Sequence, residues 1–142
     1  MKTLILTLSI LSLLNIGNTA SAANAPANKN SLTKTDCKKE ETYQEISKAD
    51  LQKLVAEKAV FAIDVNSDES FKEEHVPGAI HFSANEKNFA QVLPKDKNAA
   101  IVAYCGGVQC TAWKKAAEKA CELGYTNIKH FKEGITGWKK KS

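Results

Sequence analysis

Short apolar runs recur along the chain from Tyr43 onward and predict β-strands. The two clearest, 60–65 and 99–104, are almost wholly apolar, as strands buried on both faces of a sheet are. Three shorter runs at 43–46, 79–82 and 127–131 predict further strands. The pattern therefore predicts five short strands.

Polar and amphipathic segments separate these runs and predict helices. A helix is expected after Ser47, whose side chain suits a helix start, and others within 66–74, over 85–93, after residue 112 and over 134–138. Because strands and helices alternate, the predicted class is α/β, with a mostly parallel five-stranded sheet covered by helices on both faces.

The beginning of the chain follows a different pattern. Lys2 precedes the apolar run 4–16, and the small residues 20–22 follow it, which is typical of a secretory signal peptide cleaved after Ala22. The apolar run is too short to span a bilayer comfortably. We therefore expect a periplasmic or secreted protein that has no membrane attachment after cleavage. The predicted organisation is a signal peptide at 1–22, a flexible polar leader at 23–42 and one domain at 43–142.

Charge excludes a nucleic-acid-binding surface. The net charge is +4, from 20 basic and 16 acidic residues, and the lysines are scattered among glutamates. All the basic residues are lysine. The chain thus lacks arginine, the side chain that usually clamps oxyanions in two-point contacts. Nothing in the sequence indicates an oligomeric state.

Cys105 is the candidate nucleophile. It comes directly after the predicted strand 99–104 and shortly before a predicted helix, and ligand sites of open α/β sheets lie at such strand ends. The helix N-terminus favours a thiolate, so we expect its pKa to lie below the roughly 8.5 of a free thiol. Gly106 and Gly107 allow the backbone to curl around the sulfur.

These motifs together resemble the single-domain rhodanese family, a sulfurtransferase-type fold. The resemblance covers 43–140 and rests on four stretches in the family's order: Asp64-Val65 with His75-Val76-Pro77-Gly78-Ala79, Tyr104-Cys105 with its loop, Gly124-Tyr125-Thr126-Asn127-Ile128, and Gly134-Ile135-Thr136-Gly137-Trp138. It implies a three-layer fold in which Cys105 carries sulfane sulfur as a persulfide, without a cofactor. It also implies a cradle around the sulfur, formed by Gly106, Gly107, Val108, Gln109, Cys110 and Thr111.

Three positions depart from the family's pattern. Val108 replaces a common glycine, Cys110 replaces a common arginine, and Asn66 replaces the arginine that often follows the Asp-Val pair. Without arginine, thiosulfate loses a two-point partner, and Lys114 in the next helix offers only a point charge. We therefore expect weak thiosulfate:cyanide transfer. Polysulfide, small thiols or a partner protein's thiol are the expected exchange partners, with polysulfide or a protein persulfide as donor.

Cys110 stands five residues after Cys105 and has two interpretations. If the loop closes tightly, the two Cα atoms fall within the roughly 4.4–6.8 Å that a disulfide requires. Cys110 is then a resolving thiol for a persulfide or sulfenic acid on Cys105. In the other interpretation it is a small packing residue. The alternatives to a sulfurtransferase are accordingly a thiol–disulfide redox protein using this pair, and a non-enzymatic sulfur-binding module.

The other two cysteines are predicted to have no role in the chemistry. Cys37, in the leader, is by default a free, exposed thiol, and pairing with Cys121 or with another chain is the alternative. Cys121 is expected to pack at the core boundary. A zinc site made by Cys105, Cys110 and a histidine is not expected, because the spacing is unusual and no second pair completes it.

Four polar residues complete the set of candidates. Asp64 ends a buried strand and is expected to support the loop, holding its amides or His75. His75 is expected to fix the turn that follows it through a ring N–H. His81 and His130 fall on short strands and are expected to be half-buried.

Overall fold

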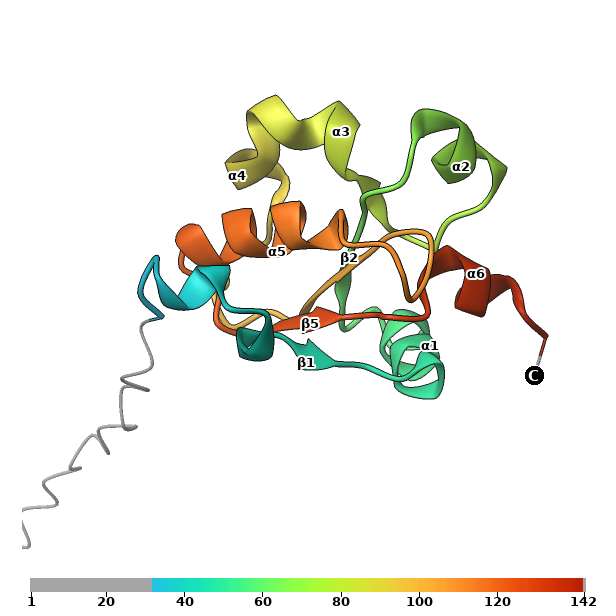
Figure 1. Ribbon diagram of the computed structural model, residues 1–142, viewed down its shortest axis with the longest axis horizontal. Coiled ribbons are helices and arrows are strands. Elements are labelled where there is room, and N and C mark those ends of the chain that lie inside the picture. Colours follow the sequence, from blue (N-terminus) through green and yellow to red (C-terminus); the bar gives the residue numbers. More distant parts are fainter. Residues whose placement is uncertain (1–31, 142) are drawn as a thin grey trace, which may run out of the picture.

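The computed structural model describes residues 32–141, which contain a five-stranded parallel sheet (Figure 1). Its spatial order is β1-β5-β4-β2-β3, so β4 is central. The predicted α/β class and parallel sheet are confirmed. The strands are β1 Gln44–Glu45, β2 Phe61–Asp64, β3 Ile80–His81, β4 Ile101–Tyr104 and β5 Ile128–His130.

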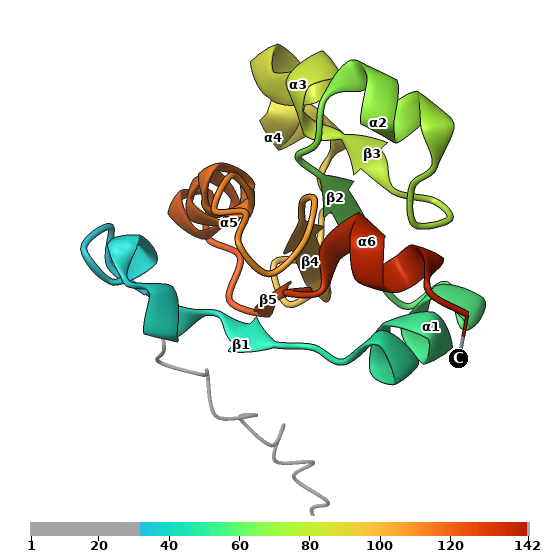
Figure 2. The same ribbon diagram turned by 45° about the vertical axis from the view of Figure 1, so that its right-hand side comes forward.

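Helices lie on both faces of this sheet. Figure 2 shows α5 and α6 on opposite sides of β4. Three short 3-10 turns accompany the helices, at Asp36–Lys38, Glu40–Thr42 and Glu86–Asn88. The helices are α1 Lys48–Ala56, α2 Asp68–Glu73, α3 Phe82–Asn85, α4 Phe89–Val92, α5 Trp113–Glu122 and α6 Gly134–Lys139.

The single helix predicted over 85–93 is wrong. The segment contains two short helices, α3 and α4, joined by a 3-10 turn. Asn85 ends α3, and its side chain donates to the carbonyl oxygen of His81 at 2.8 Å, a local bond that competes with helix continuation. The rings of Phe82 and Phe89 then meet edge to face, 5.1 Å apart, in the core.

Side-chain alternation divides the core between the two faces of the sheet. Ile63 and its register partner Ala103 lie in the cluster beneath α5, while Ala62 and its partner Val102 lie in the cluster beneath α1 and α6. All four are buried. This two-sided burial explains why the strands appear in the sequence as continuous apolar runs.

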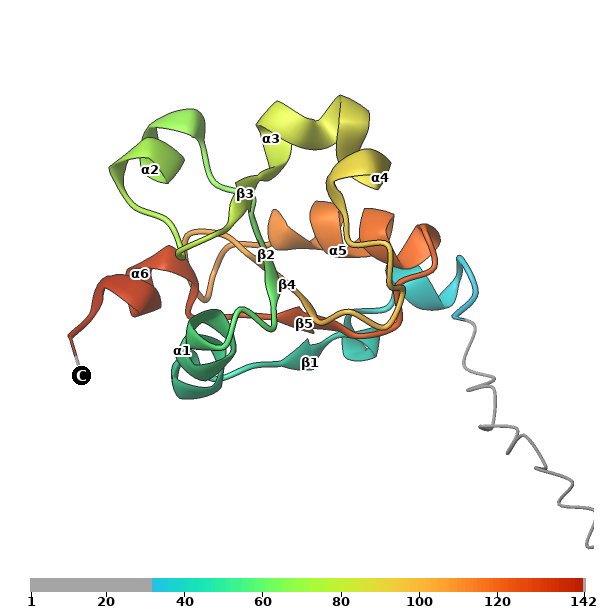
Figure 3. The same ribbon diagram turned by 180° about the vertical axis from the view of Figure 1, so that it is seen from behind.

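The end of the predicted leader packs against α5. Cys37 is 1% exposed and forms a disulfide with Cys121 of α5, with Cα atoms 5.7 Å apart. Beside it, Lys38 Nζ lies 2.6 Å from Glu118 Oε2. Figure 3 shows this segment beside one end of α5. The expectation of a free, exposed Cys37 is therefore wrong, because the first 3-10 turn lies directly on α5.

Two expectations concern residues outside 32–141. The signal peptide at 1–22 and the first part of the leader fall there, so they stay predictions. None of the helices within residues 32–141 has the length and apolar character needed to cross a bilayer.

Loss of the Cys37–Cys121 disulfide is expected to destabilise the fold. This bond closes a loop with a sequence separation of 84. The double variant Cys37→Ser/Cys121→Ser should lose roughly 2–5 kcal/mol of unfolding free energy, measured by urea denaturation, because its unfolded chain is less constrained. The matched variant Cys105→Ser/Cys110→Ser opens a loop with a separation of only five and should lose less. Equal losses would contradict this account.

His130 is a buried polar residue at the end of β5. It is 6% exposed, more deeply buried than expected, and its ring stacks on Trp113 with centroids 3.7 Å apart. Burial lowers the pKa of His130 to about 4. The folded protein therefore holds this ring neutral at pH values where the unfolded chain would protonate it.

Replacement of His130 is expected to weaken the pH dependence of stability. Between pH 6.5 and about 4, His130 is protonated in the unfolded chain but neutral in the folded protein. The free energy of unfolding therefore decreases as the pH falls through this window. His130→Phe keeps an aromatic ring against Trp113 but does not titrate. The unfolding free energy of this variant, measured in urea at a series of pH values, should depend on pH less steeply, by the equivalent of about one proton. Parallel slopes for the variant and the wild type would refute the assignment.

Candidate active site

The active-site loop, residues 105–110, joins β4 to α5. Cys105 follows the last residue of β4, and α5 begins at Trp113. Cys105 and Cys110 form a disulfide across the loop, with Cα atoms 6.2 Å apart. Cys105 is 2% exposed, whereas Cys110 is only partly buried. The loop is therefore closed tightly enough to bring the second thiol to the candidate nucleophile.

In the first part of the loop the carbonyl groups of residues 105–107 accept hydrogen bonds, whereas the amides of residues 106–109 do not donate any within the described part of the chain. The carbonyl oxygens of Cys105 and Gly106 accept from the N–H groups of Ile135 and Thr136, at 2.9 and 3.0 Å, and Gly107 O accepts from Cys110 N at 2.9 Å. In contrast, the N–H groups of residues 106–109 find no acceptor within residues 32–141. Such a run of free amides favours an anion.

Gly134 permits this close docking of the loop on α6. Its φ is +57°, a region that side-chain-bearing residues rarely adopt. A Cβ at this position would lie 2.6 Å from Gly107 N and 2.7 Å from the carbonyl carbon of Gly106. A glycine is therefore required where α6 meets the loop.

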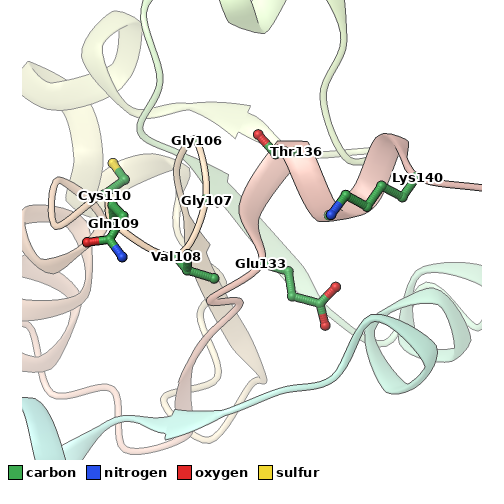
Figure 4. A pocket seen from close by; sticks show the side chains of 9 residues that line it. Gly106, Gly107, Val108, Gln109, Cys110, Glu133, Thr136 and Lys140 are labelled. Atoms are coloured by element: carbon green, nitrogen blue, oxygen red, sulfur yellow. The ribbon is translucent and has the colours of Figure 1, made fainter.

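A hollow of about 450 Å³ opens between the loop and α6 (Figure 4). Sequence reasoning assigned no site role to its α6 side, and only the family signature at 134–138 pointed to that stretch. Residues 32–141 contain no group of three His, Cys, Asp or Glu side chains that could hold a metal ion. The hollow is lined by Gly106, Gly107, Val108, Gln109 and Cys110 from the loop, and by Glu133, Thr136, Gly137 and Lys140 across from it.

Five predicted site residues do not line this hollow: Cys105, Asp64, His75, Thr111 and Lys114. Lys114 turns to the N-terminal segment, where its Nζ lies 2.6 Å from Glu40 Oε2, and this bond lowers the pKa of Glu40. The next lysine, Lys115, pairs with Glu86 at 2.9 Å. Thr111 is exposed and does not line the hollow. The expected point charge from Lys114 therefore does not reach the loop, because its ammonium group pairs with Glu40 instead.

Asp64 supports the loop region indirectly. Its side chain is fully buried, and Oδ1 accepts from both the backbone N–H and the side-chain amide of Asn66, at 2.8 and 2.7 Å. Oδ2 has no hydrogen-bond partner in the described part of the chain. A Cβ on Gly106 would lie 3.6 Å from Asn66 Oδ1, so Asn66 borders the loop. Asp64 therefore holds Asn66 rather than the loop amides or His75.

The His75 ring contacts α2, which precedes it, and not the turn that was predicted to depend on it. Its Nδ1 lies 2.8 Å from the carbonyl oxygen of Phe71, and its ring stacks on Phe71 with centroids 4.1 Å apart. The neighbouring Val76 N–H donates to the Tyr104 hydroxyl at 2.9 Å. Burial and the nearby charge of Asp64 raise the pKa of Tyr104, so this hydroxyl stays protonated. The 75–79 stretch is thereby tied to β4, one residue before Cys105.

Comparisons with known proteins identify the family. A family model described as "Rhodanese-like domain" matches residues 47–141. The chain belongs to the rhodanese-like family. Thiosulfate sulfurtransferase GlpE of Coxiella burnetii is 26% identical over 98 residues, covering 68% of this chain and 88% of that protein. Thiosulfate sulfurtransferase PspE of Escherichia coli is 35% identical over 83 residues, covering 54% and 77%.

Solved structures support the same rhodanese-like fold. The human single-domain sulfurtransferase TSTD1 superposes with a TM-score of 0.57 at 21% identity, covering 69% of this chain and 97% of that one. A rhodanese-related protein from Thermoplasma volcanium superposes with a TM-score of 0.54 at 23% identity, covering 68% and 90%. The relatives' names support sulfur transfer as the general activity of this rhodanese-like domain.

Substitution of Gly134 is expected to displace the loop. Gly134→Ala combines a strained backbone with overlap against loop backbone atoms, so we expect a loss of roughly 2–4 kcal/mol in urea unfolding. Gly124 is the matched control, because its φ is +92° but nothing lies within 4 Å of an added Cβ. Gly124→Ala should therefore lose only about 1–2 kcal/mol. If the two variants are equally stable, close docking at Gly134 is not the constraint.

Proposed function

We propose that this protein is an exported sulfurtransferase that carries sulfane sulfur as a persulfide on Cys105. The observation that carries the proposal is the active-site loop itself. A cysteine at the carboxyl end of β4 is followed by the free N–H groups of residues 106–109. These groups are available to stabilise the negative charge of a thiolate and then of a terminal persulfide sulfur.

The proposed transfer has two balanced steps. The Cys105 thiolate attacks the sulfane sulfur of a donor persulfide, forming a new S–S bond, while the donor's S–S bond breaks and its thiolate leaves. An acceptor thiolate then attacks the terminal sulfur and restores the Cys105 thiolate. One difficult transfer is thereby divided into two easier ones through a covalent intermediate.

The charges around the hollow favour polysulfide or a protein persulfide over thiosulfate as the donor. The chain has no arginine, and Lys114 and Lys115 are paired with glutamates. Lys140 is the one lysine that lines the hollow, where Glu133 also lies. A doubly charged thiosulfate therefore meets one cation, one carboxylate and no two-point guanidinium partner. We propose weak thiosulfate:cyanide transfer on this basis.

A second function, thiol–disulfide exchange, is favoured by the Cys105–Cys110 disulfide. In this function the pair passes electrons between partners and no sulfur atom is carried. The signal peptide pattern at 1–22 supports a proposed location in the periplasm or outside the cell for either function. Partners are in both cases small sulfur compounds or a protein thiol.

Sulfur loading of the Cys110→Ser variant is the test of the proposed function. This variant cannot close the loop disulfide, so any sulfur taken up is retained. After reduction and removal of the reductant, incubation with glutathione persulfide should add one sulfur atom at Cys105, detected by intact and peptide mass spectrometry. Polysulfide should load it faster than thiosulfate does.

The control and the opposing result are equally specific. Cys105→Ser/Cys110→Ser should gain no sulfur under the same conditions. A glutathione adduct on Cys105 of Cys110→Ser, without added sulfur, would instead support the thiol–disulfide function, because the donor would then have been attacked at its glutathione sulfur with loss of sulfide.

A further inference from the structure

We propose that Cys110 discharges the Cys105 persulfide as hydrogen sulfide, and that an external thiol then reopens the resulting disulfide by attacking Cys110. This inference rests on the proposed function, since it requires a persulfide on Cys105. It makes the protein a sulfide-releasing enzyme driven by thiols, rather than a carrier that needs a separate sulfur acceptor.

The loop geometry places the two sulfurs within bonding reach. The disulfide between Cys105 and Cys110 has Cα atoms 6.2 Å apart, within the usual range. Backbone hydrogen bonds hold both ends in place, since Cys105 O accepts from Ile135 N and Cys110 N donates to Gly107 O. The loop backbone as described therefore accommodates the bond between the two cysteines.

Burial favours an internal nucleophile for the discharge. Cys105 is 2% exposed in the closed loop, so an external thiol has little access to its inner sulfur. Cys110 is covalently tethered beside it, and such an arrangement raises the effective concentration of the attacking thiol. Cys110, which is bonded to Cys105 in this structure, is therefore a nucleophile that does not have to diffuse to the inner sulfur.

The discharge step is balanced in atoms and electrons. The Cys110 thiolate attacks the inner sulfur of the persulfide, Cys105 Sγ, and forms the Cys105–Cys110 bond. The bond between Cys105 Sγ and the terminal sulfur breaks, and hydrosulfide leaves with both bonding electrons. The two thiols are thereby oxidised to a disulfide, and the sulfane sulfur is reduced to sulfide.

The reverse opening of the loop begins at Cys110. Of the two bonded residues, Cys110 is the one that lines the hollow, and Cys105 does not. An external thiolate attacks Cys110 Sγ, forms a mixed disulfide there and releases the Cys105 thiolate. A second thiol, for example the other half of a dithiol, then frees Cys110 and leaves as the disulfide of the reductant.

The free amides favour Cys105 as the thiolate that leaves when the disulfide opens. The N–H groups of residues 106–109 have no acceptor in the described fold and are available to a thiolate on Cys105, and a stabilised thiolate is the better leaving group. The second disulfide stays closed, because Cys37 and Cys121 are only 1% and 3% exposed. A mild dithiol should therefore reduce the loop pair and leave the structural pair intact.

A single-turnover experiment tests the discharge step. Wild-type protein is reduced with limiting dithiol, separated from it and mixed with one equivalent of glutathione persulfide carrying an isotopically labelled sulfane sulfur. We expect one equivalent of labelled sulfide and a re-formed Cys105–Cys110 disulfide. Cys110→Ser should retain the label on Cys105 and release no sulfide.

Ala112→Ser is the matched loop control. Ala112 is exposed, lies outside the hollow and comes two residues after Cys110, so this variant should release sulfide as the wild type does. Wild-type protein that retains the label on Cys105 beside an alkylatable Cys110 would overturn the discharge role while leaving sulfur carriage intact. A Cys110→Ser variant that fails to take up the label would overturn sulfur carriage itself.

Trapping of the mixed disulfide tests which of the two cysteines the external thiol attacks. Oxidised wild-type protein is exposed briefly to glutathione and then to an alkylating agent. Peptide mapping should find glutathione on Cys110 and the alkyl group on Cys105. The reverse placement would overturn the proposed entry at Cys110.

Discussion

The docking of the active-site loop on the first turn of α6 is the contact on which the site depends. Ile135 and Thr136 donate to the carbonyl oxygens of Cys105 and Gly106, and these bonds direct those two carbonyl groups toward α6. The amides of residues 106–109 are then left without acceptors inside the described fold. This division of the backbone converts an ordinary strand–helix connection into a place that favours an anionic sulfur. The missing side chain of Gly134 makes the approach sterically allowed.

The two disulfides have different positions and different consequences. Cys37–Cys121 joins the N-terminal segment to α5 across 84 positions and is buried, so it stabilises the fold. Cys105–Cys110 spans only five positions and borders the hollow, so it is open to exchange. In the proposed periplasmic or secreted location, where oxidation is the default, the accessible pair would need a source of external thiols to stay reduced. The release of sulfide from a persulfide would consume those same thiols.

Much of the fold could be predicted because its signals are local. Apolar runs buried on both faces marked β2 and β4, and the order of strands and helices implied the parallel sheet. Residues 85–93 were predicted wrongly because an Asn85 side chain bond interrupts the helical pattern. Lys114 was predicted to support the loop because it follows the loop closely in sequence. An ion pair with Glu40, which is distant in sequence, instead holds the lysine side chain against the N-terminal segment.

The sequence by itself determined the class of the fold, the family and the position of the candidate nucleophile. Each of these depends on residues that are neighbours in the chain, or on motifs in a fixed order. Only the tertiary structure decided that Cys110 bonds to Cys105, that Cys37 bonds to Cys121, and that Glu133 and Lys140 line the hollow. These facts depend on distances between elements that the sheet order β1-β5-β4-β2-β3 and the loop curvature bring together, and residue spacing along the chain does not specify such distances.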